Sequence, residues 1–122
     1  MFSYTLKIGK KNVKLLTTAR TALYYKQIFN EDLLVFMLVR ANDGSANDAE
    51  AVDVAQKLCF VMAKQAEKAD MKQLNFDSYA DWLDTMSQMD LIHASFSIIE
   101  VYKENMAGLS ASKKKDEEPS AE

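Results

Sequence analysis

The chain has 122 residues and a net charge of −3, with 48% hydrophobic and 27% charged residues, which is ordinary for one globular domain. Three glycines and one proline exclude a collagen-like chain, and the apolar content excludes disorder throughout. One cysteine and one histidine exclude an internal disulfide and a structural zinc site of the usual composition.

The first predicted elements are two strands joined by a short turn. Apolar and polar side chains alternate over residues 2–8 and again over residues 12–17, which is the period of a half-buried strand. Gly9 and Asn12 border the turn between them. We therefore expect a β-hairpin. It must pack on helices or on a strand of another chain, because two strands alone are marginally stable.

Two helices are predicted next. Thr17 or Thr18 can cap a helix that runs to about Phe29. Asn30 is expected to cap a second helix, which opens with two acidic residues and continues as an unbroken apolar run over residues 33–39. A helix that is apolar on every side is expected to be buried on all sides. So short a run is also compatible with a strand, but the cap and the acidic first turn favour a helix.

A long helix is predicted over residues 48–69. Asn47 stands at its cap position and Glu50 follows three residues later, which is the spacing of a capping box. Small and apolar residues recur every three or four positions, and Cys59 lies among them, so we expect a buried and unreactive thiol. Phe60 falls away from this stripe, among polar residues, so we expect either a single exposed aromatic side chain or a contact with the hairpin or another subunit.

Two further helices are predicted before the chain becomes polar. Asp77 or Ser78 can cap a short helix that carries aromatic residues. Ser87 can cap the last helix, which has a wide apolar arc. Gly108 is the expected end of that helix, because glycine readily adopts the left-handed conformation that follows a helix.

These elements define the expected fold class. We expect an α+β domain, mainly α, in which an N-terminal β-hairpin is followed by about five helices over residues 1–108. A disordered polar tail is expected over residues 109–122. The longest apolar run is far shorter than the roughly 18–20 residues of a membrane span, and the N-terminus lacks the pattern of a signal peptide. We therefore expect a cytosolic protein.

The sequence shows no catalytic pattern. His93 is expected on the solvent side of the last helix, beside carboxylates, which is not the setting of a general base. The acidic residues Asp77, Asp81 and Asp84 share a helix face but lack the loop carbonyls and glycine turn of a calcium site. Only two arginines and a negative net charge argue against a nucleic-acid partner. We expect a protein that is not an enzyme and needs no cofactor.

The unusual features concern surfaces. Seven methionines are many for this length, and methionine-rich surfaces adapt to varied partners. The 33–39 run requires burial on more sides than one small domain readily offers. We therefore expect a self-associating interaction protein. Its candidate partner-binding side chains are Phe36, Phe60, Met86 and Met89.

Two stretches resemble a known family. The first reads YTLKIGKKNVKLLTTARTALYYKQIFNEDLL, a hairpin with a short turn, a helix with a tyrosine-rich middle, and IFNEDLL opening an apolar helix. The second, NFDSYADWLDTM, is an acidic, aromatic short helix that precedes the last helix. Over roughly residues 2–106 the chain is similar to the small tail assembly chaperones of long-tailed phages and prophages of Gram-positive bacteria.

The resemblance implies a partner and a mode of synthesis. Members of that family bind the long, hydrophobic tape measure protein and keep it soluble until the tail tube polymerises around it. Many are also made as a longer product by programmed ribosomal frameshifting, with an extra domain proposed to recruit tail tube protein. Codons for Lys113, Lys114 and Lys115 would suit such a frameshift site, although the run also reads as a solubilising tail.

The resemblance also implies a place in the infected cell. We expect a homo-oligomer in the host bacterial cytoplasm that is absent from the mature virion, with no membrane partner. One alternative is another small phage morphogenesis or structural component, such as a connector or tail terminator, which would remain in the finished particle. The other is a small-ligand enzyme or regulator, for which the sequence offers no site.

Overall fold

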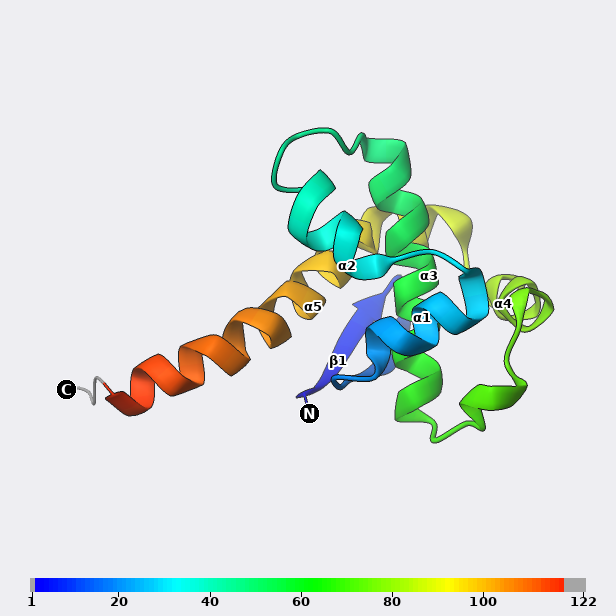
Figure 1. The fold of residues 1–122 in the computed structure, drawn as a ribbon. Coiled ribbons are helices and arrows are strands. Elements are labelled where there is room, and N and C mark those ends of the chain that lie inside the picture. Colours follow the sequence, from blue (N-terminus) through cyan, green and yellow to red (C-terminus); the bar gives the residue numbers. More distant parts are fainter. Residues whose placement is uncertain (1, 118–122) are drawn as a thin grey trace.

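The computed structural model describes the backbone of residues 2–117 and the side chains of residues 2–106. A two-stranded antiparallel hairpin comes first and helices follow (Figure 1). The predicted fold class, an α+β domain that is mainly α with an N-terminal hairpin, is confirmed. Of the polar tail predicted to be disordered over residues 109–122, residues 109–117 continue the last helix, and residues 118–122 lie outside the described residues.

The hairpin consists of β1 (Phe2–Ile8) and β2 (Lys11–Thr17), close to the predicted bounds. Gly9 and Lys10 form the two-residue turn between them. Gly9 has a φ of 63°, in the left-handed region that favours glycine. A Cβ atom at this position would also collide with the carboxylate of Asp90. The turn therefore favours glycine for its conformation, and a larger residue would also have to displace the Asp90 side chain.

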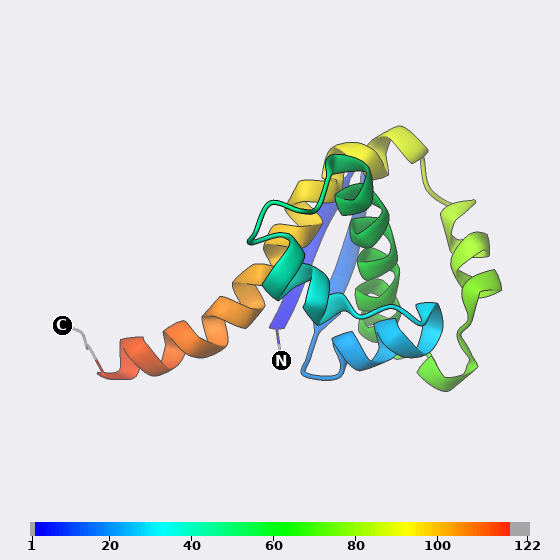
Figure 2. The same ribbon diagram turned by 45° about the horizontal axis from the view of Figure 1, so that its top comes forward.

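Two long helices position the hairpin. The helix α3 (Asp48–Ala66) packs against β2, and α5 (Gln88–Glu117) packs against β1 (Figure 2). Ile8 and Leu15 point into this interface and are only 2% and 1% exposed. Burying these side chains away from water supplies the support that an isolated hairpin lacks.

The helix α1 (Thr21–Phe29) starts later than predicted. Arg20 is at its N-cap position and no side chain caps the helix, so the prediction that Thr17 or Thr18 caps it is wrong. Thr17 is instead the last residue of β2. The hydroxyl of Thr18 accepts a hydrogen bond from the backbone N–H of Arg20 at 3.0 Å, which closes a turn between strand and helix.

The segment after α1 also differs from the prediction at its cap. Asn30 adopts a left-handed conformation with a φ of 55° and ends α1, so the prediction that it caps the next helix is wrong. Asp32 is that cap, and it precedes α2 (Leu33–Val35) and the π-helical turn η1 (Phe36–Arg40). The choice of helix over strand for residues 33–39 is confirmed.

The start of α3 follows the prediction and its end does not. The Asn47 side chain accepts a hydrogen bond from the N–H of Glu50 at 2.8 Å, which confirms the cap. The carboxylate of Glu50 pairs with Arg40 at 2.6 Å instead of completing a capping box. The helix ends before residue 69, and Lys68 then turns the chain with a φ of 61°.

A short 3₁₀ turn, η2 (Met71–Gln73), leads into α4 (Phe76–Leu83). Asn75 caps α4 by accepting a hydrogen bond from the N–H of Ser78 at 3.0 Å, and the Ser78 hydroxyl accepts one from the N–H of Asn75 at 3.3 Å. This is a capping box, in which the side chain of each residue accepts a hydrogen bond from the backbone N–H of the other. The prediction that Asp77 or Ser78 is the cap is therefore wrong.

The side of α3 that carries Phe60 is closed by α4. Every residue from 57 to 63 is buried, and Phe60 is 0% exposed. Its ring centroid lies 6.4 Å from that of Phe29, 5.5 Å from that of Tyr79 and 5.6 Å from that of Trp82. The expectation that Phe60 lies off the buried face is therefore wrong, because aromatic side chains of α4 cover it.

The last helix, α5, begins as predicted. The Ser87 hydroxyl accepts a hydrogen bond from the N–H of Asp90 at 3.4 Å. The helix continues through Gly108 to Glu117, so the expected end at Gly108 is wrong. A single glycine inside a helix costs only about 1 kcal/mol relative to alanine, which is too little to end it.

Candidate partner-binding surface

The apolar run over residues 33–39 is buried on one side only. Leu33, Phe36 and Met37 point into the core and are 1%, 6% and 3% exposed. The remaining apolar side chains are 40–55% exposed, and we call them the apolar face: Leu34, Val35, Leu38 and Val39. The prediction of burial on all sides is wrong, because the domain covers this short segment from one side alone.

Helical spacing brings the exposed side chains together. Residues four apart are neighbours on a helix surface, so Leu34 lies beside Leu38 and Val35 beside Val39. Contiguous apolar side chains on a surface mark an interaction site more often than single exposed ones do. The apolar face is therefore the strongest candidate for contact with a partner.

Polar contacts hold both ends of the apolar face. Asp32 Oδ1 accepts hydrogen bonds from the N–H groups of Leu34 at 3.1 Å and Val35 at 3.2 Å. At the other end, the carbonyl of Arg40 accepts hydrogen bonds from the following loop, including one from the N–H of Ser45 at 3.1 Å. These contacts fix the segment against the domain and leave its apolar side chains free.

A hollow of about 340 Å³ lies beside the apolar face and reaches the start of α3. Val35 and Phe36 form part of its apolar wall. Carboxylates form much of its polar lining, and they come from α3 and from the residues before α2: Glu31, Asp32, Glu50 and Asp53. The surroundings of the apolar face are therefore acidic.

Lys57 neutralises part of this acidic lining from beneath. Its Nζ lies 3.0 Å from Glu31 and 2.9 Å from Asp53. Burial lowers the pKa of Lys57, but the hydrogen bonds and charges of the two carboxylates outweigh it, and the pKa is raised overall. Burial and the nearby carboxylate of Glu31 both raise the pKa of Tyr25, whose hydroxyl donates to Glu31 at 3.4 Å. Lys57 therefore stays charged and Tyr25 neutral near pH 7.

The four residues predicted to bind a partner do not form one surface. Phe36 and Phe60 are buried at 6% and 0% exposure. Met86 is half-buried against the core, and Met89 is 56% exposed near the start of α5. Sequence reasoning indicated that a small domain could not surround the 33–39 run, but from this run it named only Phe36, which is buried. It could not separate the inward side chains from the outward ones, because every residue of the run is apolar.

The groups considered for chemistry lie in ordinary surroundings. Cys59 is 0% exposed, which confirms its predicted burial, and this burial raises the pKa of its thiol to about 12, which disfavours the reactive thiolate. His93 is on the solvent side of α5, as predicted. Within the described part of the chain, no three histidine, cysteine or acidic side chains cluster closely enough to hold a metal ion.

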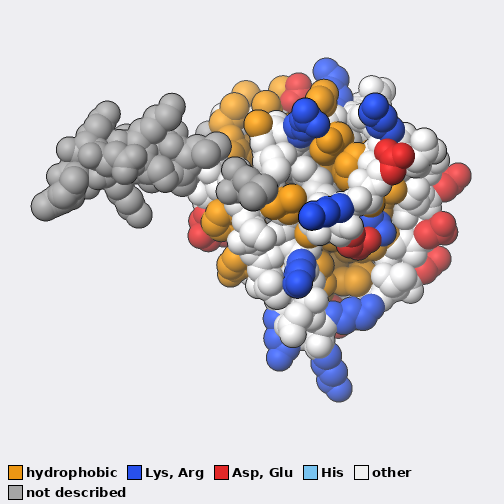
Figure 3. Space-filling view, turned by 90° about the horizontal axis from the view of Figure 1, so that it is seen from below, with side chains coloured by type: hydrophobic (Ala, Val, Ile, Leu, Met, Phe, Trp, Pro, Cys, Tyr) orange, Lys and Arg blue, Asp and Glu red, His pale blue; other side chains and the backbone are white. Residues whose placement is uncertain are grey.

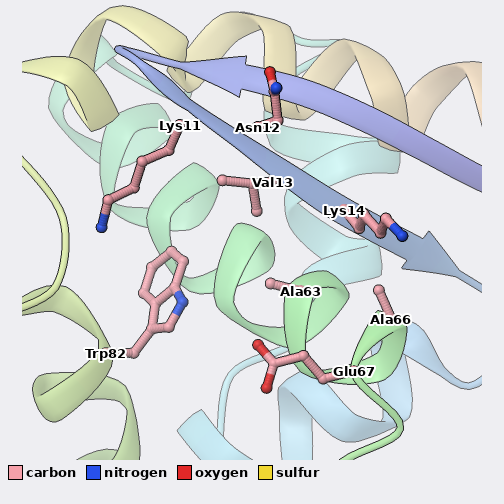
Figure 4. Close-up of a pocket in the computed structure, with 8 residues that line it drawn as sticks. All are labelled: Lys11, Asn12, Val13, Lys14, Ala63, Ala66, Glu67 and Trp82. Carbon is pink, nitrogen blue, oxygen red and sulfur yellow. The ribbon is translucent and has the colours of Figure 1, made fainter.

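A second hollow, of about 510 Å³, lies between the hairpin, α3 and α4 (Figure 4). Lys11 and Trp82 extend toward one another across it, while the amine of Lys14 is directed elsewhere. Lys11 Nζ donates a hydrogen bond to the carbonyl of Thr85, so this amine already has a partner. The hollow is open and its polar groups do not converge, unlike those of a small-molecule site.

The described helices include none with the length and apolar character needed to cross a membrane. Comparison with protein-family models, with curated proteins and with solved structures finds no match to this chain.

Proposed function

We propose that the chain is a tail assembly chaperone of a long-tailed phage. In this proposal it binds the hydrophobic tape measure protein in the host bacterial cytoplasm and keeps it soluble until the tail tube forms. It acts as a homo-oligomer, without catalysis or a cofactor, and is not retained in the mature virion. A longer frameshifted product would recruit tail tube protein.

The apolar face is the observation that carries this proposal. A client that exposes apolar helices needs a surface on which those helices can be buried, because removing apolar area from water stabilises the complex. Leu34, Val35, Leu38 and Val39 provide such a surface at a fixed position. An amphipathic helix can lay its apolar stripe on it, as in other helix recognition.

The charges around the face specify the client further. The hollow beside it contains four carboxylates. Arg40 pairs with one of them and Lys57 with two others, so an excess of negative charge remains at the rim. A client helix whose apolar stripe is flanked by lysine or arginine would therefore gain favourable electrostatic contacts at the rim. Such contacts are screened by salt, whereas the apolar contact is not. Binding is expected to weaken only modestly as the ionic strength rises.

Co-expression with the tape measure protein tests the proposal. The wild-type chain should keep the client in the soluble fraction of a lysate. Replacing both Leu34 and Leu38 by glutamine should return the client to the pellet, because glutamine has similar length and helix propensity but cannot bury as apolar surface.

The matched control is Leu23→Gln on α1. Leu23 is 61% exposed, so its substitution removes an exposed leucine outside the apolar face. This variant should keep the client soluble. An equal loss in both variants, or no loss in either, would contradict the assignment of the client to the apolar face. Detection of the chain in purified virions by mass spectrometry would instead favour a structural component.

A further inference from the structure

The outer edge of β1 offers backbone hydrogen-bonding groups to another strand. Within the described residues the sheet has two strands, and β1 pairs with β2 along one edge. Because the two-residue turn places hydrogen-bonded pairs at every second position, the N–H and C=O groups of Ser3, Thr5 and Lys7 point away from β2. The edge contains no proline, and Lys7 is its one charged residue, so it lacks the usual protection against pairing.

A groove runs beside this edge, between β1 and α5. Tyr4 and Leu6 line it from the strand, and Phe96 and Val101 line it from the helix, around a volume of about 260 Å³. Tyr4 is 42% exposed and Phe96 is 58% exposed. Since α5 packs against β1, a third strand placed beside β1 would lie over this groove and cover both aromatic rings.

The two ends of the groove differ in charge. The hairpin carries four lysines and no carboxylate, and three of them lie at or next to its turn: Lys7, Lys10 and Lys11. Gly9 lies against Asp90 near the start of α5, so one carboxylate accompanies the three lysines at this end. Glu100 and Glu104, which also line the groove, come later on that helix, toward the opposite end of the strand. On the face seen from below, lysine and arginine side chains lie at the lower margin and also across the middle and the top, among apolar side chains (Figure 3).

This arrangement fits one occupant best, the same strand of a second copy. An antiparallel β1 would bring its lysine-rich turn to the end that carries Glu100 and Glu104. A parallel β1 would set one lysine-rich turn beside the other and be repelled.

We infer that two copies pair through their β1 strands, antiparallel and related by a two-fold axis, to form a four-stranded sheet. The strand Phe2–Ile8 is centred on Thr5, so full overlap places Thr5 opposite Thr5 of the second copy and Ser3 opposite Lys7. Tyr4 and Leu6 of each copy then cover the exposed Phe96 of the other. The dimer supplies a surface for the self-association in the proposed function, but it does not depend on the identity of the client.

Proline substitution tests whether the outer edge of β1 or that of β2 pairs with a second copy. Thr5→Pro removes an outward N–H from β1 without removing a hydrogen bond to β2. Lys14→Pro is the matched control, because Lys14 is the direct partner of Thr5 in the hairpin and its N–H points out from the other edge. Sedimentation equilibrium should show a wild-type dimer and a Lys14→Pro dimer. The dissociation constant of Thr5→Pro should rise by at least about tenfold, from lost edge hydrogen bonds and backbone mismatch.

Disulfide trapping tests the register. Two Thr5→Cys side chains would face one another across the axis, at a Cα separation of about 5.5 Å that a disulfide can bridge. Mild oxidation should therefore give a covalent dimer of Thr5→Cys and leave Lys14→Cys monomeric on a denaturing gel. The native Cys59 does not interfere because it is buried.

Three results would overturn the inference: a monomeric wild type at high concentration, dissociation by Lys14→Pro rather than Thr5→Pro, or an intact dimer in both variants. If Thr5→Pro unfolds, Phe96→Gln replaces it, because Phe96 is exposed and its loss should weaken the dimer without unfolding the chain. These measurements use the chain alone. A chain that keeps the client soluble but does not pair through β1 would refute the inference and leave client binding by the apolar face standing. A chain that pairs through β1 but leaves the client insoluble would support the inference and refute client binding.

Discussion

Two largely apolar stretches of the chain differ in how far they are exposed to solvent. Residues 33–39 are apolar without a break, yet four of them are 40–55% exposed. Residues 57–63 of α3 include a lysine, yet all of them are buried. From composition alone, residues 33–39 would be expected to be the more buried of the two stretches.

The number of neighbouring elements explains the difference. The helix α3 contacts β2, α1, α4 and α5, so side chains on every side of it find a partner. Lys57 can be buried there because its amine reaches two carboxylates at the edge of the core. The α2 and η1 segment meets the domain from one side, and its outer side chains stay in water. Tertiary contacts therefore decide which side chains are buried, and the apolar character of a stretch does not decide it alone.

The largest effect is expected for Phe60, at the centre of the buried stretch. Phe60→Ala should lower the free energy of unfolding by about 3–5 kcal/mol, because it leaves a cavity among three aromatic rings. Urea denaturation followed by circular dichroism measures this loss. A change below about 1 kcal/mol would mean that the site is open to solvent, and it would contradict the description of residues 57–63 as fully buried.

Smaller losses of stability should distinguish the buried side of the 33–39 run from its exposed side. Leu33→Ala should cost about 2–5 kcal/mol, whereas Leu34→Ala should change stability by less than about 0.5 kcal/mol. The two residues are adjacent and of one type, but Leu33 is 1% exposed and Leu34 is 40% exposed. Equal costs in denaturation experiments would show that the segment is covered on both sides in the free chain.

Alkaline pH should weaken the core around α3. The pKa of Cys59 is raised from 9.0 to about 12, so above pH 9 the unfolded chain loses the thiol proton before the folded chain does. Stability is therefore complete below that pH and falls as the pH rises toward 12. The raised pKa values of Tyr25, Tyr79 and Lys57 act in the same direction. Denaturation should show a loss of about 1–2 kcal/mol between about pH 8 and pH 10.

Cys59→Ala serves as the control for this pH dependence. The variant lacks the thiol, so its free energy of unfolding should fall less steeply over the same range. An identical slope in the variant and the wild type would show that the thiol does not contribute.

The regular elements of the fold were predictable from local patterns. Alternation over residues 2–8, a glycine in the turn and Asn47 before a long helix each specify a local structure with little need of distant contacts. The errors lie at helix ends, where neighbouring polar residues compete for one role. Asn30 and Asp32 illustrate this, because both suit a cap and the backbone conformation at Asn30 decided between them.

The candidate surface was less predictable than the fold. Phe60 stands among polar residues along its helix, and only the position of α4 shows that an aromatic cluster surrounds it. Leu34 and Leu38 carry no sign in the sequence that separates them from Leu33. Which side of an apolar helix faces water depends on contacts between distant parts of the chain, and a local pattern does not contain them.

The most direct test of the central claim is the binding of a tape measure fragment to the apolar face. Isothermal titration with wild-type chain, Leu38→Gln and Leu23→Gln compares two exposed leucines that differ in position, at 55% and 61% exposure. All three proteins should have free energies of unfolding within about 0.5 kcal/mol of one another. Leu38→Gln should weaken binding by at least about tenfold while Leu23→Gln binds as the wild type does. Equal affinities of all three proteins would contradict the claim that this face holds the client.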